Sequence, residues 1–176
     1  AFEEAEQLFR HCPPEHPQGY IYHILAAIHE NVAGRSESAI KRVDAAIRFG
    51  RRWGLHFHDK HLLLRKLWSL VTKGQVNEAR QVVSEIESLP RYCGFSRAVT
   101  LRLRAWLELV DGDPRAALHF GEKAGELYRR IDCAFFMKVT ELGKAAALAE
   151  LQQGAGDNPA GTAVARRRGR QGGAEF

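Results

Sequence analysis

Apolar residues recur at helical spacing through the middle of the chain and predict amphipathic helices. One strip is formed by Leu63, Leu67, Leu70 and Val71, and another by Val99, Leu103, Trp106 and Val110. Residues three or four positions apart lie on one face of a helix. The second segment carries a further apolar strip, formed by Leu101, Ala105 and Leu109. A helix with two apolar strips is expected to contact two neighbours, as a helix inside a stack does.

A short motif, a glycine followed after four residues by an alanine, occurs three times at nearly constant spacing. The copies begin at Gly34, Gly74 and Gly112 and end at Ala39, Ala79 and Ala117, so the spacings are 40 and 38 residues. Each glycine follows a run of helix-forming residues, and each alanine opens another run. Because glycine readily adopts the left-handed conformation that ends many helices, each motif predicts a turn between two helices.

The residues at these turns also indicate where the second helix of each pair begins. Asp113 can cap a first helical turn and Pro114 suits the first helical position, whereas Ser36 and Asn77, each followed by glutamate, are weaker start signals. The alanine of each motif lies where two antiparallel helices approach most closely. Seven residues later the chain has Ala46, Ile86 and Ala124. We expect both sets to face the partner helix.

Further helices are predicted on either side of this pattern. Residues 1–12 are expected to form the second helix of a preceding pair, and residues 133–152 the first helix of a following pair. The apolar positions of the latter are Phe136, Val139, Leu142, Ala146 and Ala149. Such ends predict a fragment of a longer array, with apolar surface at both ends that favours self-association.

The predicted fold is therefore all-α, a solenoid of antiparallel helix pairs with about three full repeats and half-repeats at the ends. The helical domain is expected to span residues 1–153 and a disordered tail residues 154–176. Residues 161–176 are rich in glycine, alanine and arginine, and bury too little apolar surface to offset the entropy of ordering. A native tail, a product of an altered reading frame and a remnant of cloning are all consistent with this composition.

The pattern of Gly-x4-Ala turns resembles the tetratricopeptide repeat (TPR) family. With its spacing of about forty residues, it is most similar to the helical repeat domain of bacterial MalT-like and related signal-transducing ATPase regulators. The resemblance covers roughly residues 19–153, although the Trp, Tyr and terminal Pro positions of the family are mostly absent. It implies a right-handed α-solenoid whose first helices line a concave surface, and a role in transcription regulation or signal transduction.

Composition is that of a globular protein, with 45% hydrophobic and 27% charged residues among 176. No run approaches the ~18 apolar residues of a membrane span, and no cleavable leader is evident, so a cytoplasmic location without membrane association is expected. The cysteines, Cys12, Cys93 and Cys133, are odd in number and far apart. Buried free thiols are therefore expected rather than a disulfide framework or a zinc site.

Two of the five net positive charges lie in the tail, although it is short. Residues 154–176 contain Arg166, Arg167, Arg168 and Arg170 against Asp157 and Glu175, which leaves +3 for the remaining 153 residues. The arginine run has no aromatic neighbour that could stack on bases. We expect a solvated tail and no direct binding to nucleic acid.

Catalytic and metal-binding motifs are weak or missing. His56-Phe57-His58-Asp59-Lys60-His61 superficially resembles a metallohydrolase signature, but on a helix only His58 and His61 share a face, and zinc needs three or four ligands. No phosphate-binding glycine loop and no GxSxG motif are present. We expect no enzyme activity, no catalytic residue, no cofactor and no metal.

Polar strips on the first helices provide the candidate binding residues. One strip is formed by His61, Arg65, Ser69 and Thr72, and the other by Arg97, Thr100, Arg104 and Glu108. Arg65 and Arg104 fall nine and eight residues before their turn glycines, so they are expected side by side in the concave groove. Paired guanidinium groups suit a carboxylate. The alternative is that these residues only solvate an exposed face.

Two functions from different classes follow. The first is a non-catalytic module for protein–protein interaction, whose groove holds an acidic or extended segment of a partner or of another domain of the same polypeptide. The second is a domain of a MalT-like ATP-dependent transcriptional regulator that senses a small effector between its helices. A nucleotide-binding domain before the repeats and a helix-turn-helix after them would favour the sensor.

Overall fold

The structure, a computed structural model, describes residues 4, 7, 18–56, 58–89 and 93–156. Its helices are α2 (Gln18–Val32), α3 (Ser36–Trp53), α4 (Asp59–Thr72), α5 (Val76–Ser88), α6 (Gly94–Val110), α7 (Pro114–Arg130) and α8 (Ala134–Gly156). No described residue lies in a strand, which confirms the all-α prediction. Apart from Glu4 and Gln7, the helix predicted over residues 1–12 lies outside the described residues, as does the predicted tail from residue 157 onward.

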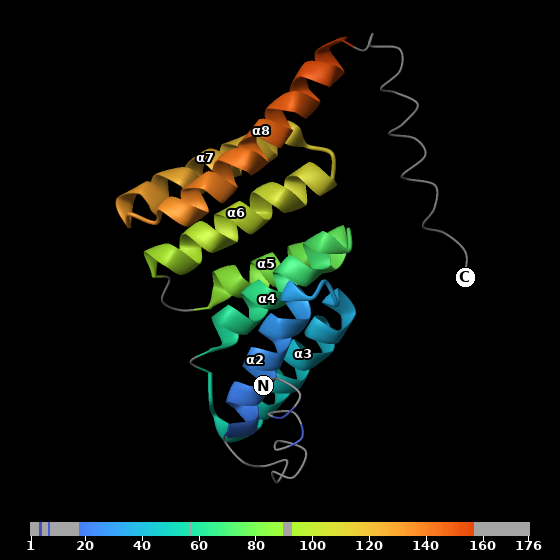
Figure 1. The fold of residues 1–176 in the computed structure, drawn as a ribbon, viewed down its shortest axis with the longest axis vertical. Helices are drawn as coiled ribbons and strands as arrows, with labels where there is room; N and C mark the ends of the chain where they lie inside the picture. Colours follow the sequence, from blue (N-terminus) through green and yellow to red (C-terminus); the bar gives the residue numbers. More distant parts are fainter. Residues whose placement is uncertain (1–3, 5–6, 8–17, 57, 90–92, 157–176) are drawn as a thin grey trace, which may run out of the picture.

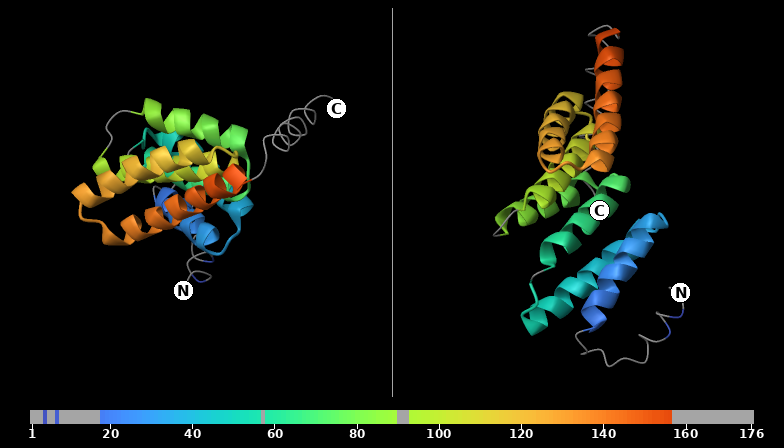
Figure 2. Two further views of the ribbon diagram at one scale, coloured as in Figure 1. Left: turned by 90° about the horizontal axis from the view of Figure 1, so that it is seen from above. Right: turned by 60° about the vertical axis from the view of Figure 1, so that its left-hand side comes forward.

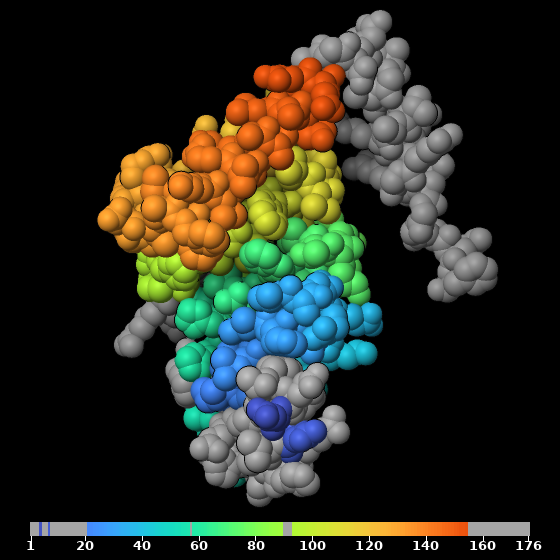
Figure 3. All heavy atoms as spheres, viewed as in Figure 1, coloured from blue at the N-terminus to red at the C-terminus, as the bar shows by residue number. Residues whose placement is uncertain are grey.

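The helices pack in sequence order, and the stack runs along the long axis of the molecule (Figure 1). Each helix from α2 to α8 packs against the next, and α2 also packs on α4, α4 on α6, and α6 on α8. The even-numbered helices therefore form one continuous layer, with α3, α5 and α7 beside it (Figure 2). In the space-filling view the colours follow one another from α2 to α8, because later segments do not return to earlier ones (Figure 3).

The glycine turns close with a recurring hydrogen bond. Gly34, Gly74 and Gly112 have φ of 73°, 70° and 83°, the left-handed conformation expected of them. The amide that follows each glycine donates to a carbonyl five residues earlier: Arg35 to Glu30 (2.8 Å), Gln75 to Leu70 (2.9 Å) and Asp113 to Glu108 (2.8 Å). This pattern satisfies carbonyls that a helix end leaves unpaired.

Two more turns use the same bond without the Gly-x4-Ala motif. Gly54, between α3 and α4, has φ 67°, and the Leu55 amide donates to the Gly50 carbonyl at 2.7 Å. Between α7 and α8 the left-handed position is held by Asp132 at φ 51°, a conformation that aspartate tolerates better than most residues. The motif therefore marked the turns within the predicted pairs and missed these two.

Small residues face the partner helix as expected. Ala39, Ala79, Ala46, Ile86 and Ala124 have no exposed surface, and Ala117 is 3% exposed. Asp113 caps α7 by accepting from the Ala116 amide at 3.0 Å, with Pro114 in the first position. The weaker start signals were misplaced by one or two residues: Arg35 and Gln75 hold the cap positions of α3 and α5, because one residue after the left-handed glycine suffices to reorient the chain.

The apolar strips are placed correctly on α4 but only in part on α6 and α8. Leu63, Leu67, Leu70 and Val71 are all buried. At the end of α6, Val110 is 51% exposed, and on α8 Leu142 is 72% exposed. On α8, Thr140 and Ala147 are buried instead, because this alanine-rich helix has apolar residues on every side and its neighbours select the face.

The end of α8 also differs from the prediction. The helix continues to Gly156, past the expected boundary at residue 153 and into the predicted tail. Phe135 (70% exposed) and Leu142 are exposed apolar side chains of this helix. None of the described helices is long and apolar enough to cross a membrane.

The left-handed turns give a first prediction. Gly112→Ala is expected to lower the free energy of unfolding by about 1 kcal/mol, because a side chain at φ 83° is strained although no atom lies within 4 Å of the new Cβ. Gly154→Ala is the matched control, since Gly154 is helical and equally open. Urea unfolding should show the control to be neutral or stabilising; equal losses in both variants would contradict the role of the turn.

Candidate functional site

The candidate site lies where two apolar cores meet. The larger core runs through α2, α3, α4, α5 and part of α6, and the smaller joins α6 to α7 around Ala98, Ala124 and Tyr128. Side chains of α4, α6 and α8 converge at this junction.

Arg102 on α6 is the centre of the junction. It is 2% exposed, and its guanidinium carbon lies 5.4 Å from the ring centroids of Trp68, Trp106 and Phe136. These rings come from α4, α6 and α8 respectively, and the two indoles are themselves 5.5 Å apart. A cation over an aromatic face is attracted by the ring quadrupole, more strongly when it is desolvated. We call these three rings and Arg102 the arginine cage.

The arginine cage leaves hydrogen-bond donors unused. Nε and Nη1 of Arg102 are buried without a hydrogen-bond partner among the described residues, and so is the hydroxyl of Tyr128. Burial raises the pKa of Tyr128, and the nearby Arg102 opposes part of this rise. A buried cation without a counter-charge normally costs several kcal/mol, of which cation–π contacts recover a part.

A cavity of about 100 Å³ opens beside the cage, between α4, α6 and α8. Arg102, Trp68, Phe95 and Phe136 line it together with His61 and Arg65, and none of the described lining residues is acidic. Partial desolvation and the positive charge of Arg102 lower the pKa of Arg65, although much of this side chain stays exposed. Two guanidinium groups that repel each other beside an aromatic wall form a site that an anion would stabilise.

His61 adds a titratable group to the same cavity. Desolvation lowers its pKa, and the nearby charges of His58, Arg65 and Lys60 lower it further. The imidazole is therefore neutral near pH 7 and can gain a proton when an anion offsets the surrounding positive charge.

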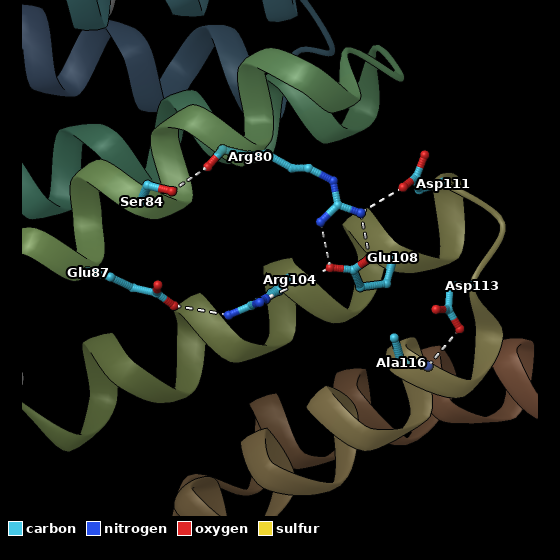
Figure 4. Close-up of polar contacts among 8 residues, drawn as sticks. All are labelled: Arg80, Ser84, Glu87, Arg104, Glu108, Asp111, Asp113 and Ala116. Carbon is cyan, nitrogen blue, oxygen red and sulfur yellow. Dashed lines mark hydrogen bonds and ion pairs between the residues drawn. The ribbon is translucent and has the colours of Figure 1, made fainter. Parts of the chain in front are cut away.

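Of the sequence-predicted binding residues, His61 and Arg65 line the cavity, whereas Arg97 and Arg104 do not. Arg97 is exposed on the first turn of α6. Arg104 points toward α5, where Nη1 lies 3.2 Å from Glu87 Oε1 (Figure 4). Its guanidinium also lies 4.1 Å from the centroid of the Phe120 ring. The expected pairing of Arg65 with Arg104 is therefore wrong.

The predicted pairing failed because Arg65 and Arg104 differ by one residue in their distance from the turn glycines. Counted from the turn glycines, Arg104 corresponds to Lys66 on α4, and one residue turns a helix by about 100°. Lys66 Nζ lies 2.7 Å from Asp44 Oδ1 on α3, as Arg104 lies against Glu87 on α5. Both cations thus bind the preceding helix instead of facing the cavity.

Arg102 itself was missed, although the sequence contained a signal. Ten residues before the turn glycines stand Ile24, Leu64 and Arg102, so a cation replaces the aliphatic residues of the earlier helices. Six residues before them, Trp68 and Trp106 occupy equal positions on α4 and α6. An arginine inside an apolar strip, one turn from a tryptophan, would have identified the cage.

Thr72 is exposed at the end of α4, whereas three other members of the predicted polar strips are buried and serve the fold. Ser69 is fully buried and donates to Asn31 Oδ1 of α2, and Thr100 donates to the Ser96 carbonyl within α6 at 2.9 Å. Glu108 is 5% exposed and belongs to an ion-pair cluster. These three residues neither line a groove nor solvate an exposed face.

This ion-pair cluster holds α5 on the end of α6 (Figure 4). Arg80 donates to both carboxylate oxygens of Glu108, at 3.1 and 2.7 Å, and to Asp111 Oδ2 at 2.6 Å. The hydrogen bonds to the two carboxylates raise the pKa of Arg80. The cluster compensates for two negative charges at a helix C-terminus, where they are otherwise unfavourable.

In the part of the chain that the structure describes, the histidine segment and the two cysteines Cys93 and Cys133 show no metal-site geometry. His56 Nδ1 lies 3.1 Å from Asp59 Oδ2, and the rings of His58 and His61 are 6.1 Å apart. Within the described residues no group of three or more His, Cys, Asp or Glu side chains could hold a metal ion.

Cys93 differs from the expected buried thiol, because it is exposed and caps α6. Hydrogen bonding to the Ser96 side chain and amide lowers its pKa. Cys133 is free and half-buried, and Cys12 lies outside the described residues.

Comparisons with known proteins gave no relationship: no protein family, no curated protein and no solved structure matches this chain. The candidate site is therefore argued from its own geometry.

The ion-pair cluster predicts unequal effects of two arginine substitutions. Arg80→Met is expected to lower the free energy of unfolding by about 2 kcal/mol, because it leaves the buried Glu108 carboxylate with only the longer ion pair to Arg104, at 3.9 Å. Arg51→Met, which removes the exposed pair with Glu85, should cost less than about 1 kcal/mol. Chemical unfolding of both variants measures the difference, and equal costs would show that the cluster adds no more than a surface pair.

The cavity predicts pH-dependent anion binding. Because the charges of His58, Lys60, Arg65 and Arg102 surround His61, a bound anion should raise the lowered pKa of His61. Protons are then taken up on binding, so acetate affinity should rise a few-fold as the pH falls from about 7.5 to about 5.5. NMR titrations test this, and His61→Gln should bind acetate with little pH dependence. An unchanged pH profile in that variant would remove His61 from the site.

Proposed function

We propose that the chain is a non-catalytic binding module that holds an acidic segment of a partner protein, or of another domain of the same polypeptide. The proposed scaffold is a TPR-like right-handed α-solenoid of about three full repeats with half-repeats at the ends, as part of a bacterial regulatory protein. The recurring turn hydrogen bonds and the continuous layer of even-numbered helices support this architecture.

One observation carries the proposal. Arg65 and Arg102 line one cavity between α4, α6 and α8, and no acidic residue of the described ranges borders it. Other cations at this junction, such as Arg80 and Arg104, are paired with carboxylates of the chain itself. Cations that share a cavity without a carboxylate of the chain favour an external anion, and the guanidinium group suits a carboxylate.

A second candidate function has one supporting observation. The cavity lies between helices that stack on one another, so a small effector bound there would contact α4, α6 and α8 at once. Such an effector could change the stacking and pass the change to attached domains, as in a MalT-like sensor. Melting curves with small carboxylates test this function: a ligand that raises the melting temperature at micromolar concentration would favour the sensor.

The main proposal predicts charge-dependent peptide binding. A capped alternating glutamate–glycine peptide should bind to the full chain, and Arg65→Glu should weaken binding by about tenfold or more, since a cation is replaced by a repelling anion. The glutamine–glycine counterpart of the peptide should not bind. Fluorescence anisotropy measures all three affinities.

Arg115→Glu provides the matched control. It makes the same charge change on an exposed residue of α7, away from the cavity, and should leave the affinity nearly unchanged. Equal weakening by both substitutions would reduce the interaction to overall charge. An absence of binding to the acidic peptide would contradict the proposed function.

A further inference from the structure

The size of the cavity restricts what can enter it. About 100 Å³ corresponds to roughly three water molecules, or three to four non-hydrogen atoms, at about 30 Å³ for each water. Sites for ordinary small-molecule ligands have volumes of about 300 to 1,000 Å³. The cavity therefore holds a carboxylate and at most one carbon of its stem, and leaves the rest of a ligand outside.

The chemistry of the walls selects the same group. Phe95, Phe136 and Trp68 give apolar contacts to a methylene stem, and Arg102 supplies the buried charge. Arg65 lies at the same cavity with much of its side chain in solvent. A side chain with a terminal carboxylate on a hydrocarbon stem matches these walls, because the carboxylate meets the buried charge while the stem lies against the aromatic rings.

We propose that a single glutamate or aspartate side chain of the partner segment inserts into this cavity and pairs with the guanidinium group of Arg102, which borders it, while Arg65 contacts the carboxylate from the solvent side. The inference rests on the proposed function and names the part of the partner that the site recognises. The remainder of the acidic segment lies on the surface and contributes less specifically.

The proposal has a consequence for stability. If the buried charge serves a ligand, the free protein bears a desolvation cost that a similarly shaped apolar side chain would remove. Arg102→Met should then melt at the same temperature as the parent chain or a few degrees higher. If the guanidinium serves only to hold the rings of Trp68, Trp106 and Phe136 together, the same substitution should lower the melting temperature.

The test uses the full chain and a probe with one side-chain carboxylate, N-acetyl-glutamate N-methylamide, with its glutamine analogue as the uncharged control. In ¹H–¹⁵N NMR spectra the glutamate probe should shift the Nε–H signal of Arg102 and the indole signals of Trp68 and Trp106. The indole of the exposed Trp53 serves as an internal reference and should not move. Arg102→Met should weaken binding of the probe by roughly 30-fold or more.

The outcomes separate the inference from the proposed function. Binding of the glutamate–glycine peptide that depends on Arg65 but survives in Arg102→Met would overturn the insertion and leave the module intact. A loss of both peptide and probe binding in the parent chain would overturn both.

Two further results would each overturn the inference. An Nε–H signal of Arg102 that stays in place on saturation with the probe would show that the carboxylate does not enter the cage. Equal shifts with inorganic phosphate would show an unselective anion site instead of a carboxylate site.

Discussion

The two apolar cores of this molecule meet at a guanidinium group that is surrounded by three aromatic rings. Arg102 lies where the core of the first helices ends and that of the last helices begins, and α4, α6 and α8 each supply one ring. The rings can remain close to the cation only while these three helices keep their spacing. The arginine cage therefore couples the spacing of α4, α6 and α8 to the position of one buried cation.

The junction is polar to a degree that the rest of the core is not. On the α5 side, Arg80 of α5 pairs with Glu108 of α6, and Arg104 of α6 pairs with Glu87 of α5. The charges of both arginines are therefore balanced. On the α8 side, the balance is left to aromatic faces, which attract a cation more weakly than a carboxylate does. Because of this asymmetry across α6, the cation without a carboxylate partner lies at the cavity.

The close packing around the cage leaves little freedom at Trp106. A Cβ added to Gly143 of α8 would lie 3.0 Å from Trp106 Nε1, so the missing side chain makes room for the indole. On α7, a Cβ at Gly121 would lie 2.9 Å from Lys144 Cγ. Small residues thus bring α8 near enough to α6 and α7 for Phe136 to reach the cage.

The sequence by itself determined the helices, the glycine turns and the residues that face the partner helix, because these depend on spacing within a few residues. Only the tertiary structure decided which face of the alanine-rich α8 is buried, and that Arg102 shares a cavity with Arg65 while Arg104 does not. A shift of one residue turns a side chain by about 100°, so register across two helices cannot be settled by counting along one. The arginine cage arises from three helices and exists only once they have packed.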